Sequence, residues 1–395
     1  MPARAAMAEA GSRPPSDDAA MAPLALDLLT DRAAFEALKP EWDGLFARAG
    51  MPQQLFLRHA FLRHWCDHYL DAGSRVCILG GRSSGRLVML WPLLRRRSLG
   101  LDILQFMGAP VAQFGDVLVE PGPHRQAWLD AGWKALDQLG ADLFEIRQLR
   151  ADAALSRPEA ALLVQRQDAP FAELERRVSA EGPSLAYPAR ERSNYRRRLR
   201  RLAERGELGF GALTPGAEAR ELAATAVTMK RRALARHGIL APTVADPRFQ
   251  KLFAALAGDA ADEAGLRLSL VTCAGRPIGI DISFDCLGRS FGHVIASDPD
   301  FEREGIGRIL IHRAFAEARA RGSAVFDLLA PADPYKLEHA DGSVAVYDLA
   351  MPLSRRGRLV CALALPRLRP TLKTMAKRLP AAWVRRWLKV TRRSG

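Results

Sequence analysis

Two glycines, Gly305 and Gly307, open a stretch of helical periodicity that continues to Gly322. A helix usually begins at a Ser, Thr, Asp or Asn residue whose side-chain oxygen accepts from a free backbone N–H group. Glycines leave these donors uncovered, and the positive end of the helix dipole attracts an anion to them. The pair therefore predicts a phosphate-binding helix start, although a glycine can also begin a helix for reasons of packing alone.

Asp281 and His293 both lie in apolar stretches that alternate like strands. An unpaired carboxylate is costly inside a core, so Asp281 either faces a cleft as a catalytic base or faces water. Alternation over residues 278–285 places it with Ser283 and Asp285, opposite the aliphatic side chains, which favours a solvated face. The pKa of a histidine suits proton transfer near neutrality, so His293 is a catalytic candidate, although a lone strand histidine is more often structural.

An arginine cluster lies in the helical stretch over residues 190–206: Arg196, Arg197, Arg198, Arg200 and Arg201. It predicts either contacts with a phosphorylated or sugar-nucleotide acceptor, with Arg197 and Arg201 as candidates, or a solvated charged face. Tyr195 is the only aromatic residue beside the cluster, so a stacking surface for single-stranded nucleic acid is not predicted.

The elements that must position these residues follow a regular order in the second half of the chain. Three helices come first, then three strands joined by tight turns: 190–206, 217–238, 247–257, 266–273, 278–285 and 290–297. The glycine-opened helix and a strand over residues 324–330 complete this unit.

The first half has a similar order of strands and helices: 24–31, 32–50, 57–70, 75–81, 85–97, 101–108, 124–140 and 142–149. The order predicts an α/β (α+β) fold of two tandem domains, each a mixed sheet flanked by helices. The expected division is a disordered leader, two domains and a basic tail: 1–23, 24–170, 171–353 and 354–395.

Composition limits the class of protein. A chain of 395 residues is long enough for two domains with separate cores. Its five cysteines lie far apart and form no C-x-x-C pair, which argues against zinc and disulfides and for a reducing compartment. Residues 1–23 contain no apolar stretch of signal-peptide type, so we expect a cytoplasmic protein.

The net charge of +14 is concentrated in the tail, where residues 354–395 contain 13 Lys and Arg and no acid. Apolar residues recur there at helical spacing from Leu372 to Val390, with Trp383 and Trp387 among them, and Pro380 interrupts the pattern. This composition predicts that residues 355–395 lie on an anionic membrane surface, at its cytoplasmic face. Packing against a protein is the alternative, and nucleic acid is a less favoured partner.

The order of strand, glycine loop, helix and strand around residues 290–330 resembles that of the GNAT acyltransferases. Within them, residues from about 187 to 340 are similar to the cellulose-biosynthesis (CelD/BcsL-type) proteins, which are related to the FemAB aminoacyltransferases. The resemblance rests on "NYRRRLRRLAERG", "GRPIGIDISF", "EREGIGRIL" and "VFDLLAPADPYK". The first half resembles the same family through "QQLFLRHAFLRHW" and "GRLVMLWPLLRRR".

The resemblance implies transfer from acyl-coenzyme A, most simply acetyl-coenzyme A, by direct attack and without a metal. The family's loop reads Gln/Arg-x-x-Gly-x-Gly/Ala and holds the donor's pyrophosphate on backbone amides. This chain departs from it, with Glu302 at the first position. The implied donor contacts are Ile295, Arg303, Gly305, Ile306, Gly307 and Arg308. Tyr335 is implied as the acid for the leaving thiolate and Lys336 as an acceptor contact, although both could simply close the domain.

The implied acceptor is a small molecule or glycan, namely a saccharide or a lipid-linked precursor of an envelope polysaccharide. A donor of the aminoacyl-tRNA type, as in the FemAB relatives, is a second hypothesis, and the basic helix would then hold RNA. A binding protein on a degenerate GNAT fold is the third, with Glu302 as its clearest sign. The sequence carries no signal for an oligomeric state.

Overall fold

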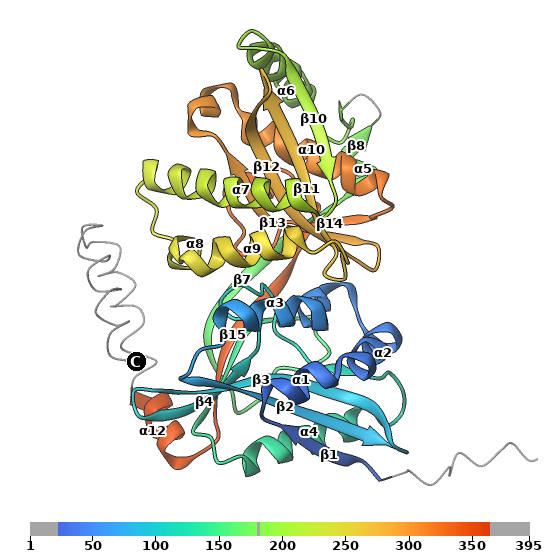
Figure 1. Cartoon of the computed structure of the whole chain (residues 1–395), viewed down its shortest axis with the longest axis vertical. Coiled ribbons are helices and arrows are strands. Elements are labelled where there is room, and N and C mark those ends of the chain that lie inside the picture. Colours follow the sequence, from blue (N-terminus) through green and yellow to red (C-terminus); the bar gives the residue numbers. More distant parts are fainter. Residues whose placement is uncertain (1–22, 180–181, 364–395) are drawn as a thin grey trace, which may run out of the picture.

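The computed structural model describes residues 23–179 and 182–363, so the predicted leader up to residue 22 and the tail from residue 364 lie outside it. The described chain forms two lobes that share one mixed sheet (Figure 1). The strand order in that sheet is β1-β2-β3-β4-β6-β15-β7-β14-β13-β12-β11-β10, with β5 beside β3. No helix in the described part is long and apolar enough to cross a membrane.

The first lobe contains the N-terminal strands and the helices that cover them. Its strands are β1 (Ala25–Leu29), β2 (Ser74–Ser83), β3 (Arg86–Ser98), β4 (Leu101–Phe106), β5 (Leu118–Val119) and β6 (Leu143–Arg150). Its helices are α1 (Arg32–Ala37), α2 (Lys39–Ala49), the 3-10 helix η1 (Pro52–Leu57), α3 (His59–Tyr69) and α4 (Arg125–Gln138). Within the predicted helical stretch 32–50, Leu38 separates α1 from α2, and Pro40 lies in the first turn of α2.

The second lobe contains the three antiparallel strands predicted from the tight turns. Its strands are β10 (Leu208–Leu213), β11 (Leu266–Cys273), β12 (Arg276–Cys286), β13 (Arg289–Ser297) and β14 (Val325–Asp327). Its helices are α6 (Ala189–Ala203), α7 (Ala217–Arg236), α8 (Pro242–Ala245), α9 (Pro247–Gly258), η2 (Pro299–Glu304), α10 (Ile306–Ala320) and α11 (Pro334–Leu337). Helix α10 covers one face of this sheet, while α7 and α9 pack on the other.

Two long strands join the lobes at the centre of the sheet (Figure 1): β7 (Leu162–Glu173) and β15 (Gly342–Pro352). Strand β15 pairs with β6 on one side and β7 on the other, and β7 continues the sheet to β14. The α/β fold of two mixed-sheet units flanked by helices is therefore confirmed, with the two sheets continuous. The expected boundary after residue 170 falls inside β7.

Smaller elements complete the structure. They are α5 (Leu174–Arg177), β8 (Val178–Ser179), β9 (Gly182–Pro183) and α12 (Arg355–Leu363). The beginning of the predicted tail is therefore a helix packed on the first lobe, where Cys361 is buried against the sheet. Its predicted apolar stripe, which starts at Leu372, lies outside the described residues.

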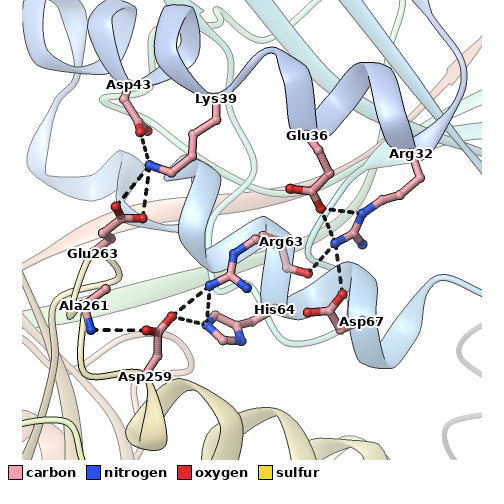
Figure 2. Close-up of polar contacts among 10 residues, drawn as sticks. All are labelled: Arg32, Glu36, Lys39, Asp43, Arg63, His64, Asp67, Asp259, Ala261 and Glu263. Carbon is pink, nitrogen blue, oxygen red and sulfur yellow. Dashed lines mark hydrogen bonds and ion pairs between the residues drawn. The ribbon is translucent and has the colours of Figure 1, made fainter.

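Polar contacts hold the helices of the first lobe against a loop of the second (Figure 2). Lys39 in α2 contacts Glu263 at 3.1 Å, while Arg63 and His64 in α3 reach one oxygen of Asp259 at 2.8 and 2.7 Å. These pairs are partly exposed, so each contributes at most about 1 kcal/mol. They align the lobes rather than supply most of the stability.

Candidate functional site

Strands β13 and β14 diverge and form a fork. They pair in parallel only where Arg289–Phe291 faces Val325–Asp327. Beyond these residues β13 continues to Ser297, whereas the chain after β14 turns toward α11. Main-chain carbonyls along the open arms then need partners other than a neighbouring strand.

A lysine ammonium group caps each arm of the fork. Lys230, on α7, donates to the carbonyl oxygen of Ile295 in β13 at 3.0 Å. Lys336, on α11, donates to the carbonyl oxygens of Leu329 and Pro331 after β14, also at 3.0 Å. Two cations therefore converge where the strands separate.

Burial changes the protonation of both lysines. Removal from water lowers the pKa of Lys230, which the carboxylate of Asp333 partly opposes. Burial also lowers the pKa of Lys336 to about 8, and the charge of Lys230 adds to this effect. A neutral Lys336 would retain two N–H donors for its two carbonyl partners and gain a lone pair.

Tyr335 lies beside Lys336 at the start of α11 and remains 38% exposed. Burial of its ring raises the pKa of its hydroxyl, and the charges of Asp333 and Asp281 raise it further. The hydroxyl therefore stays protonated near neutral pH and can donate a proton or a hydrogen bond. The structure places Tyr335 and Lys336 together, as the sequence order implied.

Asp281 is completely buried, so the predicted solvated face is wrong. A Cβ atom at Gly279, on the same face of β12, would lie 3.3 Å from Ile306, which shows that α10 covers this face. Burial raises the pKa of Asp281 to about 7, and the nearby charge of Glu317 adds to the rise. Among the described residues, neither carboxylate oxygen receives a hydrogen bond of standard geometry. In this conformation the carboxylate has no surface exposed to a substrate.

His293 lies on the opposite face of the sheet, among the rings of Phe253 and Phe284. Its Nε2 atom is 2.9 Å from the carbonyl oxygen of Val111 in the first lobe. Since a carbonyl only accepts, Nε2 carries the proton, and burial lowers the pKa of the ring to about 4. His293 is therefore neutral and ties β13 to the first lobe, while Nδ1 has no partner within the described residues.

The start of α10 fits an anion. Gly305 caps the helix at a φ of 76°, and a Cβ atom there would lie 2.7 Å from the Nε atom of Arg198 on α6. A Cβ atom at Gly307 would meet nothing within 4 Å, so the approach to that amide is open. The first-turn N–H groups of Ile306 and Gly307 lie before the helical hydrogen-bonding pattern begins. The side chain of Ile306 is buried, so only its backbone can contact a ligand.

The charges around this helix start are balanced by specific pairs. Glu302 does not reach back over the helix start, because its carboxylate contacts Nε2 of His237 at the end of α7 at 2.8 Å. Arg308 forms ion pairs with Glu191 and Glu338, and Glu191 also holds Arg198 at 2.8 Å. The departure at Glu302 therefore leaves the glycine loop accessible to a phosphate.

The remaining predicted residues lie apart from the fork and from the start of α10. Arg303 lines a hollow of about 430 Å³ with Arg205 and Arg236, beside η2. Arg197 and Arg201 are exposed on α6, where Arg197 donates to Asn194 at 2.9 Å. The described residues contain no cluster of three or more His, Cys, Asp or Glu side chains that could hold a metal ion.

Lys230 was not predicted from the sequence, and Arg198 was not singled out within its cluster. A lysine in an amphipathic helix such as α7 is ordinary, and nothing local indicates that its ammonium group reaches Ile295. Arg198 was one of five clustered arginines, and only the packing of α6 against Gly305 distinguishes it from the others.

The fold is that of several solved proteins of low sequence identity. L-PGS from Bacillus licheniformis is 13% identical, with 83% of this chain and 95% of that chain covered and a TM-score of 0.52. FemX is 12% identical over 76% of this chain and 93% of that chain, with a TM-score of 0.52. A conserved protein of unknown function from Bacteroides thetaiotaomicron VPI-5482 is 9% identical over 83% of this chain and 100% of that chain, at a TM-score of 0.51. These similarities establish the fold alone.

The second lobe can be assigned more closely. Residues 189–337 match the family described as "Acetyltransferase (GNAT) domain". This range runs from α6 to α11 and includes the glycine loop, the fork and both capping lysines. The second lobe is therefore similar to a GNAT acetyltransferase domain, and a further mixed-sheet lobe precedes it. No curated protein matches the chain.

Proposed function

We propose that the protein transfers an acyl group from acyl-coenzyme A to a saccharide or lipid-linked precursor of an envelope polysaccharide, as its resemblance to the CelD/BcsL-type proteins implies. The observation that supports an acyl donor is that a lysine-capped carbonyl and an open helix start follow each other closely along the chain. The arm of β13 carries the Lys230-capped carbonyl, and only η2 separates this strand from the open glycine start of α10. A donor with phosphates at one end and a carbonyl at the other fits this arrangement.

The reaction would proceed by direct attack. An amine or hydroxyl of the acceptor attacks the thioester carbonyl, the carbon–sulfur bond breaks, and Tyr335 protonates the departing thiolate. Lys230 would stabilise the charge that develops on the carbonyl oxygen. Burial lowers the pKa of Lys336 to about 8, and in its neutral form Lys336 would take the proton of the nucleophile.

A donor of the aminoacyl-tRNA type is a second hypothesis. It is favoured by α6, which exposes Arg196, Arg197, Arg200 and Arg201 with no acidic partner among the described residues. Such a face can contact a phosphate backbone. A domain that binds but does not catalyse is the third hypothesis.

Thermal stability with separate additions of coenzyme A, acetyl-coenzyme A and aminoacyl-tRNA tests the three hypotheses. Stabilisation by coenzyme A and by acetyl-coenzyme A supports the proposal, since a ligand that binds only the native state raises the melting temperature. Stabilisation by aminoacyl-tRNA alone would replace it with the second hypothesis. If none of the ligands has an effect, the result supports the third hypothesis, a domain that transfers no acyl group from either donor.

A further inference from the structure

We propose that the turn between β3 and β4, together with helix α12, docks the protein on an anionic lipid bilayer. This surface, called here the β3–β4 patch, comprises Arg97 and Leu99 at the turn and Arg355, Arg356 and Leu359 on α12. Nη2 of Arg356 donates to the carbonyl oxygen of Gly100 at 2.9 Å, which fixes the helix beside the turn. The inference does not depend on the donor or acceptor proposed above.

The proposal depends mainly on Leu99, because its side chain is 100% exposed in the described structure. Leu99 and Gly100 both have positive φ, at 51° and 75°. A turn of this kind favours Asn, Asp or Gly at its first position. The chain builds the same turn with Ser84 before Gly85, at 51° and 77°. Neither the backbone conformation nor packing within the described residues calls for leucine at this position.

Positive charge surrounds this leucine. Arg97 is exposed and lines a hollow of about 210 Å³ with Arg75. Arg355 and Arg358 are exposed on α12. No acidic side chain in the described part of the chain pairs with these two arginines, with Arg97 or with Arg75. Leu359, one turn after Arg356, is 59% exposed. Arg356 is the exception, because it lies 3.8 Å from Asp142. The exposed leucines thus lie among arginines of which most have no acidic partner in the described part of the chain.

A bilayer fits this combination better than a nucleic acid. Arginines attract anionic headgroups, while a protruding leucine can enter the boundary between headgroups and acyl chains. A nucleic acid would use the charges but gain nothing from an isolated leucine, and the patch has no aromatic side chain for stacking. The sequence continues from α12 into residues 364–395, which are basic and contain no acid. The charge of the patch and of the following sequence therefore has the same sign.

Site-specific labelling tests the contact directly in the full chain. The five native cysteines are buried, so a polarity-sensitive fluorophore can be attached selectively to a Leu99→Cys variant. We expect its emission to shift to the blue and brighten with phosphatidylcholine vesicles that contain phosphatidylglycerol, and to stay unchanged with pure phosphatidylcholine. The matched control is Ser84→Cys, at the same kind of turn at the other end of β3, where we expect no change.

Sedimentation with the same vesicles provides the second measurement. Leu99→Asp should lower binding to anionic vesicles about tenfold, because an inserted leucine is lost and a carboxylate is placed against the headgroups. The control is Leu287→Asp, which changes a 57% exposed leucine at the equivalent turn between β12 and β13. Unchanged vesicle binding by Leu99→Asp would overturn the proposal, as would emission from a label at residue 99 that does not change with vesicles. The proposal would also be overturned if the emission of the label at residue 99 were already blue-shifted without lipid, or changed only with RNA.

Discussion

Arg150 in β6 donates to the carboxylate of Asp327, the last residue of β14, at 2.8 Å, and both side chains are buried. The two residues belong to different lobes and meet where β14 separates from β13. The remaining nitrogens of Arg150 hold both oxygens of Asp152 at 2.7 and 3.0 Å. The guanidinium thus connects the first lobe to the base of the fork.

Removing Arg150 should therefore destabilise the whole protein. In Arg150→Met the carboxylate of Asp327 stays buried without its cation, which typically costs about 3–5 kcal/mol. Urea unfolding followed by circular dichroism measures this loss. The double variant Arg150→Met/Asp327→Asn should recover part of it, because the buried charge is gone. A loss below about 1 kcal/mol in the single variant would contradict a structural role for the pair.

Gly307→Glu should weaken binding of coenzyme A at least about tenfold without unfolding the domain, since a carboxylate near the helix start repels phosphate. Space around the Cβ position makes this substitution sterically tolerable. Calorimetric titration measures the affinity, and Gly307→Ala is the uncharged control, with binding near that of the original protein. Gly305 is less suitable, because its positive φ and its contact with Arg198 would add strain. Equal affinities for the Glu and Ala variants would rule out phosphate binding at this helix start.

Tyr335→Phe should reduce kcat by about 10²- to 10⁴-fold and change the KM for the donor much less. A leaving-group acid acts mainly in the transition state, and phenylalanine retains the ring of this α11 residue. Steady-state kinetics with acetyl-coenzyme A separates the two parameters. A variant with full kcat would leave the tyrosine with a packing role only.

Lys230→Gln should lower kcat by about ten- to a hundredfold, because the amide can still cap Ile295 but lacks the charge that stabilises a developing oxyanion. Lys230→Arg retains a cation and serves as the control. We expect unfolding transitions close to that of the original protein for both. If Gln and Arg variants turn over equally, the positive charge has no part in the reaction.

Asp281→Asn should change how stability depends on pH. The pKa of the folded state, about 7, lies above the ordinary value of 3.8, so the carboxyl holds its proton more tightly when folded. Below pH 4 the carboxyl has no effect on the free energy of unfolding. As the pH rises, the buried carboxyl destabilises the protein progressively, and this loss is complete above pH 7. The Asn variant should therefore gain up to about 4 kcal/mol over the original protein across this range. Urea unfolding at several pH values measures the difference, and parallel curves would show that Asp281 does not titrate within the core.

The elements with clear periodicity could be predicted from sequence, and the joining strands could not. Helix α10 buries apolar residues at helical spacing, and strand β12 alternates large apolar residues with small or polar ones, so local spacing identifies both elements. Strand β7 contains the polar run from Gln165 to Asp168 and is only partly buried, so alternation is weak. Its strand conformation depends on pairing with β14 and β15, which sequence spacing does not reveal.

The same limit applies to the candidate site. The glycine loop is a local motif, so Gly305 and Gly307 were recognisable from spacing alone. The cap of Lys230 on Ile295 joins residues 65 positions apart and arises only when α7 packs across β13. The environment of Asp281 was wrongly predicted for a related reason, because alternation identifies a face but not the helix that will cover it.

The position of β7 has a consequence for synthesis on the ribosome. This strand is complete at Glu173, yet both of its sheet neighbours, β14 and β15, emerge later, and β15 ends only at Pro352. Until then the nascent chain exposes an unpaired strand edge, which is a template for association with other chains. A translation product that stops before residue 352 should therefore aggregate or engage a chaperone rather than accumulate as a folded first lobe.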